Sequence, residues 1–523
     1  MGGLLIRSAT TRLAAVDPGP DRPHRGGARS SAWAWAAAFA VAAASLATNL
    51  PGLSHRSLWL DEAWTVALGL ESPSAIVHAA AHDQNPPLYN LVMAGWIAAL
   101  GTSERSMRLP SVLASAACGA LLFTFVRRFY GREAAAYAAL LFLVCEPQMH
   151  YAREARAYAL VGALSVASFY AYLALVERPS WGAAAVLGAV NAAAMYTHYT
   201  IALALVAQAV CLPLLARRDR RARRLYVASQ LIALAAFAPF VAPLVRNLPD
   251  VETSWLPPPD GRMLREVALE LVGSKAALVF GAVVAAAWPA LRTWRERPGE
   301  DGAATDGGRF ALALAWAAVP IALAFPISQR IPIFYARYLL FASLGWIVLV
   351  SAATASLPVP ARWRIAGALA VALFTANGIA DAPARGPDWR GAVEIARPAG
   401  GAGTAIVVLP EVGCIPLAYY AAPDALSALF ADDGTYAPDA LARSLAARGI
   451  ACGDGDAADR AIARAPDRIA VVVSGASADE ESRARSRLAA HGYAGARTER
   501  LVGVTIHLLE RARAGALRET PPS

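Results

Sequence analysis

Apolar segments separated by short polar ones fill the first 380 residues of this 523-residue chain. The first, Ala32 to Leu50, is long enough to cross a bilayer and has no clear cleavage site after it, so we expect an uncleaved membrane helix. The run Leu88 to Leu100 holds 13 residues, fewer than the ~20 that span the hydrocarbon, and is expected to lie along the outer membrane surface. Further apolar segments predict about eleven crossings in all, the later ones at 109–126, 134–150, 157–176, 182–196, 201–216, 225–245, 276–291, 310–327, 338–356 and 365–380.

The pattern changes from about Asp381 onward. Short apolar runs there predict buried strands and amphipathic stretches predict helices, with strands at 404–409 and 468–474 and helices at 438–448 and 478–490. The sequence therefore predicts a polytopic α-helical membrane domain, residues 32–380, followed by a soluble α/β domain, residues 381–523. This tail has no Gly-rich phosphate loop or nucleophile elbow in its sequence, which favours a docking or acceptor-gating role over a second catalytic centre.

Composition and charge support the membrane prediction. With 57% hydrophobic and 17% charged residues, the chain is too apolar for an ordinary soluble protein. The net charge of +9 comes from arginines in short runs between the apolar segments, which is typical of cytoplasmic loops and not of a nucleic-acid surface. These runs place the N-terminal tail, residues 1–31, in the cytoplasm, and they place the first outer loop, residues 51–108, and the C-terminal tail outside.

Polar side chains gather on the predicted outer face, beginning with the adjacent acids Asp61 and Glu62 directly after the first helix. One interpretation is that both are solvated charges at headgroup depth, between the interfacial Trp59 and Trp64. The alternative is a functional site, because the rest of the first outer loop and the later outer edges add further polar groups on the same side of the membrane. These groups are His78, His82, Asp83, Arg108, His150, Arg153, Arg156, His198, Lys275, Tyr335 and Arg337.

The loop segment 82–87 offers both ligands and a rigid backbone. His82 and Asp83 are competent ligands for a divalent cation, provided that His78 and His198 converge with them in space. The alternative is that these are solvated loop residues. Asn85-Pro86-Pro87 is expected to set the loop geometry, because proline restricts both itself and the residue before it, and to form a wall of a sugar pocket.

Five motifs occur in a fixed order along the first 380 residues: W-L-D-E-A-W-T, H-D-Q-N-P-P-L-Y, R-S-M-R-L-P-S, Y-A-R-E-A-R-A-Y and Y-A-R-Y-L-L. This order resembles the family 39-like branch of the GT-C membrane glycosyltransferases, a superfamily that includes protein O-mannosyltransferases and the aminoarabinose transferase of lipid A. The resemblance implies a multispanning enzyme of the bacterial cytoplasmic membrane. Such an enzyme moves a sugar from a polyprenyl-phosphate donor to an acceptor on the outer face, and the acceptor is a protein, a lipid or a glycan.

The resemblance also implies roles for individual residues. Asp61 matches the catalytic acidic position of the family and is the expected general base of a single inverting displacement, with Glu62 either orienting it or merely solvated. Guanidinium groups suit a leaving phosphate, and the expected phosphate ligands are Arg108, Arg337, Arg153, Arg156 and Lys275, the last three with snorkelling to the interface as the alternative. The expected substrate-binding residues are His82, Asp83, Asn85, Pro86, Tyr89, His198 and Tyr335. The chemistry requires no cofactor, and a divalent cation on His82 and Asp83 is the option left open.

Three other classes of protein compete with this hypothesis. A transporter or flippase of lipid-linked sugars is expected to carry acids and arginines in its mid-membrane segments, whereas here they cluster at the outer ends. A polymerase or ligase of such sugars relies on large late outer loops. A noncatalytic scaffold would leave Asp61 without a special role. Among the five cysteines, only Cys414 and Cys452 lie in the polar tail, where they could pair if the tail is outside.

Overall fold

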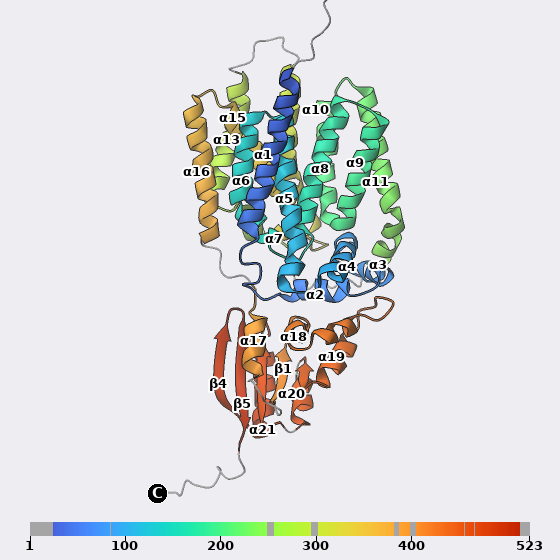
Figure 1. Cartoon of the computed structure of the whole chain (residues 1–523), viewed down its shortest axis with the longest axis vertical. Helices are drawn as coiled ribbons and strands as arrows, with labels where there is room; N and C mark the ends of the chain where they lie inside the picture. The colour runs from blue at the N-terminus through green and yellow to red at the C-terminus, as the bar shows by residue number, and fades with distance from the viewer. Residues whose placement is uncertain are drawn as a thin grey trace, which may run out of the picture.

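A computed structural model describes residues 25–83, 85–247, 256–293, 302–380, 386–397, 404–453, 455–464 and 466–512. Of the predicted cytoplasmic tail, residues 1–31, the segment 1–24 lies outside these ranges. Within them the chain forms a helical bundle with a smaller α/β domain at one end (Figure 1). This arrangement confirms the predicted fold class of a polytopic helical protein with a C-terminal α/β domain.

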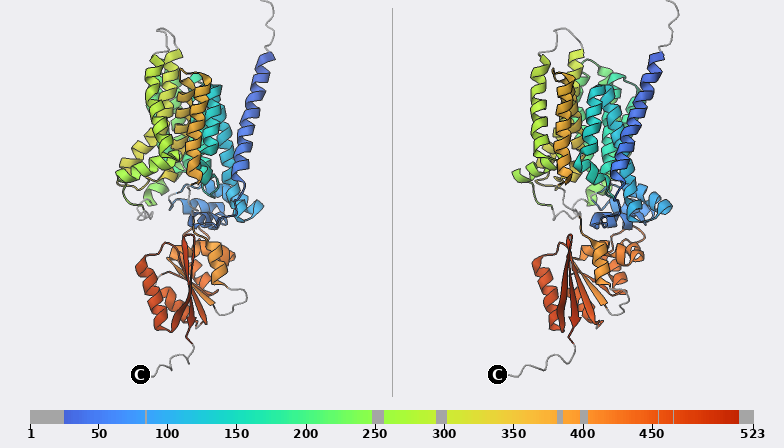
Figure 2. Two further views of the ribbon diagram at one scale, coloured as in Figure 1. Left: turned by 90° about the vertical axis from the view of Figure 1, so that its left-hand side faces the viewer. Right: turned by 60° about the vertical axis from the view of Figure 1, so that its left-hand side comes forward.

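Long helices lie side by side in the bundle, as two further views show (Figure 2). Five of them, α1, α5, α8, α11 and α14, are by length and composition able to cross a membrane, so the count of eleven crossings stays a prediction. Every segment predicted to cross falls on a helix of the bundle. These helices are α1 (Arg25–Asn49), α5 (Glu104–Phe129), α6 (Arg132–Val144), α8 (Tyr158–Glu177), α9 (Trp181–Thr197), α10 (Ala202–Leu215), α11 (Arg220–Asn247), α13 (Lys275–Thr293), α14 (Gly302–Ile327), α15 (Phe341–Ser356) and α16 (Ala361–Ala380).

The segment predicted as one helix over 134–150 is divided, so the prediction is wrong in this detail. Helix α6 ends at Val144, Cys145 takes an extended conformation, and α7 (Glu146–Ala152) begins directly after it. Pro147 explains the break, because it has no N–H to continue the hydrogen bonds of α6 and fits the first turn of a new helix. The break turns the chain at the end of the bundle where the motif Y-A-R-E-A-R-A-Y lies.

Shorter helices collect at that end, between the bundle and the α/β domain (Figure 1). They are α2 (Leu60–Gly69), α3 (Pro73–Ala80) and α4 (Leu88–Leu100), the last being the run expected on the membrane surface. Helix α3 begins where Ser72 accepts the backbone N–H of Ala75 at 3.3 Å, with Pro73 in the first turn. The loop that carries the acidic pair is therefore a compact layer of short helices.

Uncharged polar side chains connect helices inside the bundle. Ser168 Oγ of α8 donates to Asn191 Oδ1 of α9 at 2.6 Å, and Gln208 Nε2 of α10 donates to Ser168 Oγ at 2.7 Å. Asn191 Nδ2 in turn donates to Gln230 Oε1 of α11 at 3.3 Å. Hydrogen bonds of this kind stabilise helix packing where no water is available. They fix the half of the bundle that carries His198 at its end.

The α/β domain is built on a five-stranded sheet with the order β2-β1-β3-β5-β4. Its strands are β1 (Thr404–Leu409), β2 (Ile450–Cys452), β3 (Arg468–Val473), β4 (Tyr493–Leu501) and β5 (Val504–Arg511). β1 pairs in parallel with β2 and β3, and β5 runs antiparallel between β3 and β4. Its helices are α17 (Trp389–Ala396), α18 (Cys414–Ala421), α19 (Pro438–Ala446), α20 (Gly455–Ile462) and α21 (Ala478–Ala490).

The two tail cysteines are joined. Cys414, the first residue of α18, forms a disulfide with Cys452 of β2, with the two Cα atoms 6.0 Å apart. The predicted strands over 404–409 and 468–474 correspond to β1 and β3, and the predicted helices correspond to α19 and α21. The sequence prediction did not include the hairpin of β4 and β5, whose many polar residues obscure the strand pattern.

Candidate active site

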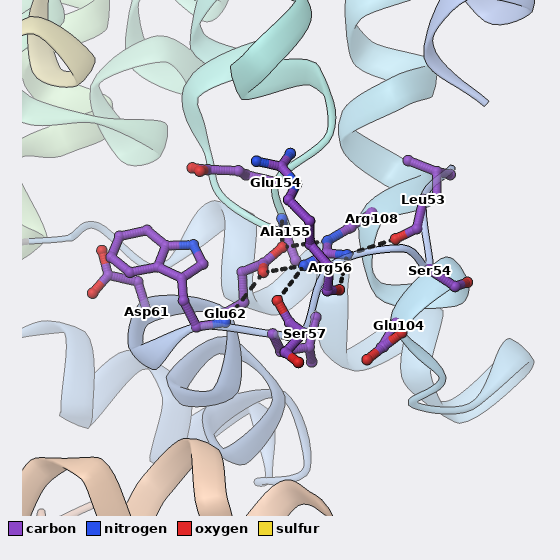
Figure 3. Close-up of polar contacts among 12 residues, drawn as sticks. Leu53, Ser54, Arg56, Ser57, Asp61, Glu62, Glu104, Arg108, Glu154 and Ala155 are labelled. Carbon is purple, nitrogen blue, oxygen red and sulfur yellow. Dashed lines mark hydrogen bonds and ion pairs between the residues drawn. The ribbon is translucent and has the colours of Figure 1, made fainter. Parts of the chain in front are cut away.

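A buried ion pair fixes the helix that carries the acidic pair. Glu62 lies in the first turn of α2 and is fully buried. Its Oε1 accepts from Arg108 Nε at 2.8 Å, and its Oε2 accepts from Arg108 Nη2 at 2.6 Å. The backbone N–H of Ala155 also donates to Oε1, at 2.9 Å. One carboxylate therefore joins α2, α5 and the loop between α7 and α8 (Figure 3), and the interpretation of Glu62 as a solvated charge is wrong.

The remaining N–H groups of Arg108 bind the loop before α2. They donate to the carbonyl oxygens of Leu53 at 2.5 Å, Arg56 at 2.8 Å and Ser57 at 3.0 Å. A guanidinium has five N–H donors, and these bonds together with those to Glu62 occupy all of them. In this structure Arg108 is a buried anchor for the outer loop, in place of the predicted ligand of a donor phosphate.

Asp61 points away from this anchor (Figure 3). Its side chain keeps 22% exposure, and Oδ2 lies 3.4 Å from Arg337 Nη1 and 3.9 Å from Arg156 Nη2. Arg156 Nη1 also donates to the Asp61 carbonyl oxygen at 3.3 Å and to Thr65 Oγ1 at 3.4 Å. Since consecutive residues of an α-helix are turned by about 100°, burial of Glu62 leaves Asp61 at the side of α2 that faces the two arginines.

Aromatic rings hold Arg337 beside Asp61. The guanidinium carbon lies 4.8 Å from the ring centroid of Tyr335, 5.3 Å from that of Trp59 and 5.4 Å from that of Tyr338. Contacts of a cation with ring faces are favourable and restrict the side chain. The structure thus brings Arg337 and Tyr335 to the site, and it adds Trp59 and Tyr338, which the sequence prediction had not assigned although both lie within the quoted motifs.

Part of the sequence and the overall fold are similar to those of known proteins. Residues 84–242 match the family model of dolichyl-phosphate-mannose-protein mannosyltransferases. The structure is similar to that of ArnT from Cupriavidus metallidurans bound to undecaprenyl phosphate, with 14% identity, a TM-score of 0.53, and coverage of 92% of this chain and 98% of that one. The chain therefore shares the fold of this membrane protein along nearly its whole length.

A second solved structure has a similar fold. The chain is similar to the oligosaccharyltransferase of Archaeoglobus fulgidus in complex with zinc and sulfate, with 11% identity and a TM-score of 0.50. The match covers 90% of this chain and 72% of that one. No curated protein matches the sequence significantly. The predicted resemblance to GT-C glycosyltransferases is therefore confirmed, and it rests on the fold and on the family model.

His198 lies beside Tyr158 and Tyr338, close enough to Arg156 and Arg337 to feel their charges. Its Nδ1 is 2.8 Å from Thr200 Oγ1, and Thr200 Oγ1 donates to the Tyr338 carbonyl oxygen at 2.6 Å. Burial, together with the charges of Arg156 and Arg337, lowers the pKa of His198 to about 3, so the imidazole is neutral at physiological pH. Its Nε2 is buried without a hydrogen-bond partner in the described structure.

The loop residues predicted as ligands lie near the site but do not form a metal centre. His82 is exposed, its ring centroid is 4.8 Å from that of His78, and its Nδ1 is 3.0 Å from the His78 carbonyl oxygen. Asp83 Oδ1 accepts from Asn85 Nδ2 at 3.4 Å. Across the described residues, no three His, Cys, Asp or Glu side chains are grouped to hold a metal ion. In particular, His198 does not join His82 and Asp83 in such a group.

Tyr89 and Pro86 lie in the protein interior, and Tyr89 is linked to a residue of the site. Both are buried, and the Tyr89 hydroxyl lies 3.0 Å from Ser111 Oγ. Ser111 Oγ donates to the carbonyl oxygen of Arg156 at 3.1 Å. Tyr89 therefore holds the backbone of Arg156 through Ser111, and its contact with substrate stays a prediction.

Two of the predicted phosphate ligands lie away from Asp61. Arg153 donates through Nη2 to the Thr48 carbonyl oxygen at the end of α1. Lys275 is exposed at the first residue of α13. Of the five predicted cations, the structure thus brings Arg156 and Arg337 to the Asp61 carboxylate, and it gives Arg108, Arg153 and Lys275 other surroundings.

An apolar groove lies beside the loop of short helices. It has a volume of about 940 Å³ and runs between α3 and α4 on one side and α9 and α11 on the other. Its lining includes Val77, Leu88, Leu91, Tyr196 and Phe240, with His82 and Arg246 among the polar residues. Because His82 and Pro87 of the loop 82–87 belong to its lining, the groove is a candidate path for a lipid chain toward this loop.

Proposed function

We propose that the chain transfers a sugar from a polyprenyl-phosphate donor to an acceptor on the outer face of a bacterial cytoplasmic membrane. The single observation that carries the proposal is the convergence of Asp61, Arg156 and Arg337 from three distant parts of the chain. A carboxylate that can take a proton, beside two permanent cations, is the set of groups that this displacement needs. The similarity to ArnT bound to undecaprenyl phosphate supports the class of donor.

In the proposed reaction Asp61 is the general base. It accepts the proton of the acceptor hydroxyl while the hydroxyl oxygen attacks the anomeric carbon of the donor sugar. The bond from that carbon to the phosphate oxygen breaks, and the polyprenyl phosphate leaves with the electron pair. The attack from the face opposite the phosphate inverts the anomeric carbon. The partial exposure of Asp61 is consistent with access of an acceptor to this carboxylate.

Arg156 and Arg337 are the proposed ligands of the leaving phosphate. Both guanidinium groups are largely buried, with side-chain exposures of 10% and 13%, so their interaction with a phosphate is weakly screened. Negative charge grows on the phosphate as the bond breaks, and fixed cations stabilise it. In the structure both guanidinium groups face the Asp61 carboxylate.

The neutral His198 and the apolar groove complete the proposed donor site. A buried Nε2 without a partner is an unfavourable arrangement, and a sugar hydroxyl would satisfy it. The groove beside α3 and α4 provides an apolar surface for isoprene units, with Arg246 and His82 at polar positions. Together they support an anchored donor whose sugar phosphate lies at headgroup depth.

The test is transfer of labelled sugar from a panel of synthetic polyprenyl-phosphate sugars, with the full chain in nanodiscs. Wild type is expected to release lipid phosphate from one donor, and Asp61→Asn, which keeps the shape but removes the base, is expected to lose at least about 100-fold in kcat. Asp424→Asn, on the exposed surface of the α/β domain, is the matched control and should retain activity. Equal turnover of Asp61→Asn and wild type would exclude Asp61 as the base.

A transporter of lipid-linked sugars is the second candidate that the same assay separates. The polar network inside the bundle, Ser168, Asn191, Gln208 and Gln230, is uncharged, and the ionised groups Asp61, Arg156 and Arg337 lie at one end. This distribution favours chemistry at a membrane face over passage through the bundle. A second preparation, the full chain in liposomes, tests for transport. Movement of labelled donor across the liposome bilayer without release of lipid phosphate would favour the transporter.

A further inference from the structure

The α/β domain packs directly against α2, the helix that carries Asp61. The ring of Trp64 on α2 meets Phe430 edge-on with 5.2 Å between centroids, and it lies 5.0 Å from Tyr436. One buried apolar cluster crosses this seam, and its members include Leu58, Ala63, Val66 and Ile76 from the outer loop and Trp389, Ile415, Leu426 and Leu429 from the domain. Helix α2 therefore lies between the bundle and the domain (Figure 1).

Hydrogen bonds from the domain hold Ser57 and Leu58, the two residues that we call the lead into α2. Ser57 Oγ donates to Asp388 Oδ1 at 2.9 Å and accepts the backbone N–H of Arg390 at 3.1 Å. The backbone N–H of Leu58 donates to the Tyr420 hydroxyl at 2.6 Å. Both residues of the lead are thus bound to the domain, three or four residues before Asp61.

The start of α5 holds the same lead from the side of the bundle. Glu104 accepts from the Tyr420 hydroxyl and pairs with Arg390, and its side chain is only 10% exposed. One turn later, Arg108 donates to the carbonyl oxygen of Ser57 at 3.0 Å. The lead into α2 is therefore clamped between the α/β domain and the first turn of α5.

We propose that the α/β domain is a positioning element of the transferase: its Tyr420 and Asp388, together with Glu104 of α5, fix the first turn of α2 and hence the direction of Asp61. The inference rests on the proposed role of Asp61 as the base. Asp61 is the second residue of α2. Motion of the backbone in the lead into α2 therefore also displaces the Asp61 carboxylate. Displacement of a reacting group by about 1 Å lowers a rate by about 100-fold, whereas substrate affinity need not change.

Tyr420→Phe removes the hydroxyl that joins Leu58 to Glu104. The matched control is Tyr419→Phe, since the Tyr419 hydroxyl donates to the Thr102 carbonyl oxygen at 2.6 Å and so crosses the same seam without reaching the lead into α2. We expect kcat of Tyr420→Phe to fall by at least about tenfold with KM for the donor within about twofold of wild type. Tyr419→Phe is expected to stay within about twofold in both constants.

A second measurement does not depend on activity. Hydrogen exchange of the segment 57–69, followed by mass spectrometry on the full chain in nanodiscs, should be faster in Tyr420→Phe than in wild type and unchanged in Tyr419→Phe. If the two variants match each other in exchange and in kcat, the positioning role is wrong. A wild type that transfers no sugar would instead count against the proposed function, and the exchange comparison would still decide whether the domain holds α2.

Discussion

Two adjacent acids on α2 serve different purposes because a helix turns them apart. Glu62 faces the bundle, where Arg108 and the backbone of Ala155 satisfy its carboxylate, and Asp61 faces the two arginines of the site. Burial of one acid fixes the rotation of the helix and so sets the direction of the other. If the order of the two acids were reversed, the aspartate would be buried and the glutamate would face the two arginines.

Replacement of Glu62 by glutamine is expected to destabilise the protein strongly. The change leaves the Arg108 guanidinium buried opposite a neutral amide, and loss of one partner of a buried pair lowers the free energy of unfolding by about 3–5 kcal/mol. Thermal unfolding of the purified protein in detergent, followed by tryptophan fluorescence, measures the effect. Glu177→Gln is the matched control.

The control removes the same charge from an exposed pair. Glu177 lies 2.9 Å from Arg128 and from Arg309 but is 33% exposed, so its loss should change the stability by less than about 1 kcal/mol. Equal shifts of the melting temperature in the two variants would show that burial does not distinguish these pairs, and the anchor role of Glu62 would be wrong.

At the scale of elements, a loop of the α/β domain rests on α3. Gly434 has φ +90°, and a Cβ atom there would lie 2.1 Å from the carbonyl oxygen of Ala75. Only glycine permits both this conformation and this approach. The contact adds a second point, beyond the clamp on the lead into α2, at which the domain is held to the outer loop.

Gly434→Ala is therefore expected to loosen the domain from α3. Gly475→Ala is the matched control, because Gly475 has φ +77° but no atom within 4 Å of an added Cβ. Both changes introduce the left-handed strain of about 1–2 kcal/mol, and the approach to Ala75 is lost only in Gly434→Ala. Hydrogen exchange of residues 73–80 measures the difference, and equal exchange in both variants would contradict the contact.

At the scale of the whole molecule, the disulfide between Cys414 and Cys452 stabilises α18. Cys414 begins α18, which carries Tyr420, and its bond to Cys452 spans 38 residues of sequence. Cys452→Ser is expected to lower the free energy of unfolding of the α/β domain by about 2–4 kcal/mol and to leave the bundle unaffected. Calorimetry of the two domains measures this effect.

Thiol labelling tests the same bond and the predicted side of the membrane. All five cysteines are buried, so the labelling is done on denatured protein, where Cys118, Cys145 and Cys211 should react without reductant and the tail pair only after reduction. Disulfides persist outside the cytoplasm and are rare within it. Two reactive tail thiols in protein taken from its own membrane, without reductant, would contradict the outer location of the domain.

Local patterns were enough to predict much of the fold. The apolar segments correspond to helices α1, α5 to α11 and α13 to α16, and the runs at β1 and β3 correspond to strands. A helix that crosses a bilayer and a strand buried on both faces both require continuous apolar sequence. The exceptions are also local in origin. Pro147 divides one predicted helix, and the polar hairpin of β4 and β5 lacks a continuous apolar run.

The sequence by itself determined the class of protein and the residue types available for chemistry, since composition, periodicity and the five motifs depend on near neighbours along the chain. Tertiary structure alone decided which of those residues meet. Asp61 contacts Arg156 and Arg337. Arg108 is equally prominent in its motif, but all of its N–H donors bind Glu62 and three backbone carbonyl oxygens. The physical reason is that a charged side chain near a membrane is either paired in the interior or left for a ligand, and long-range packing decides between the two.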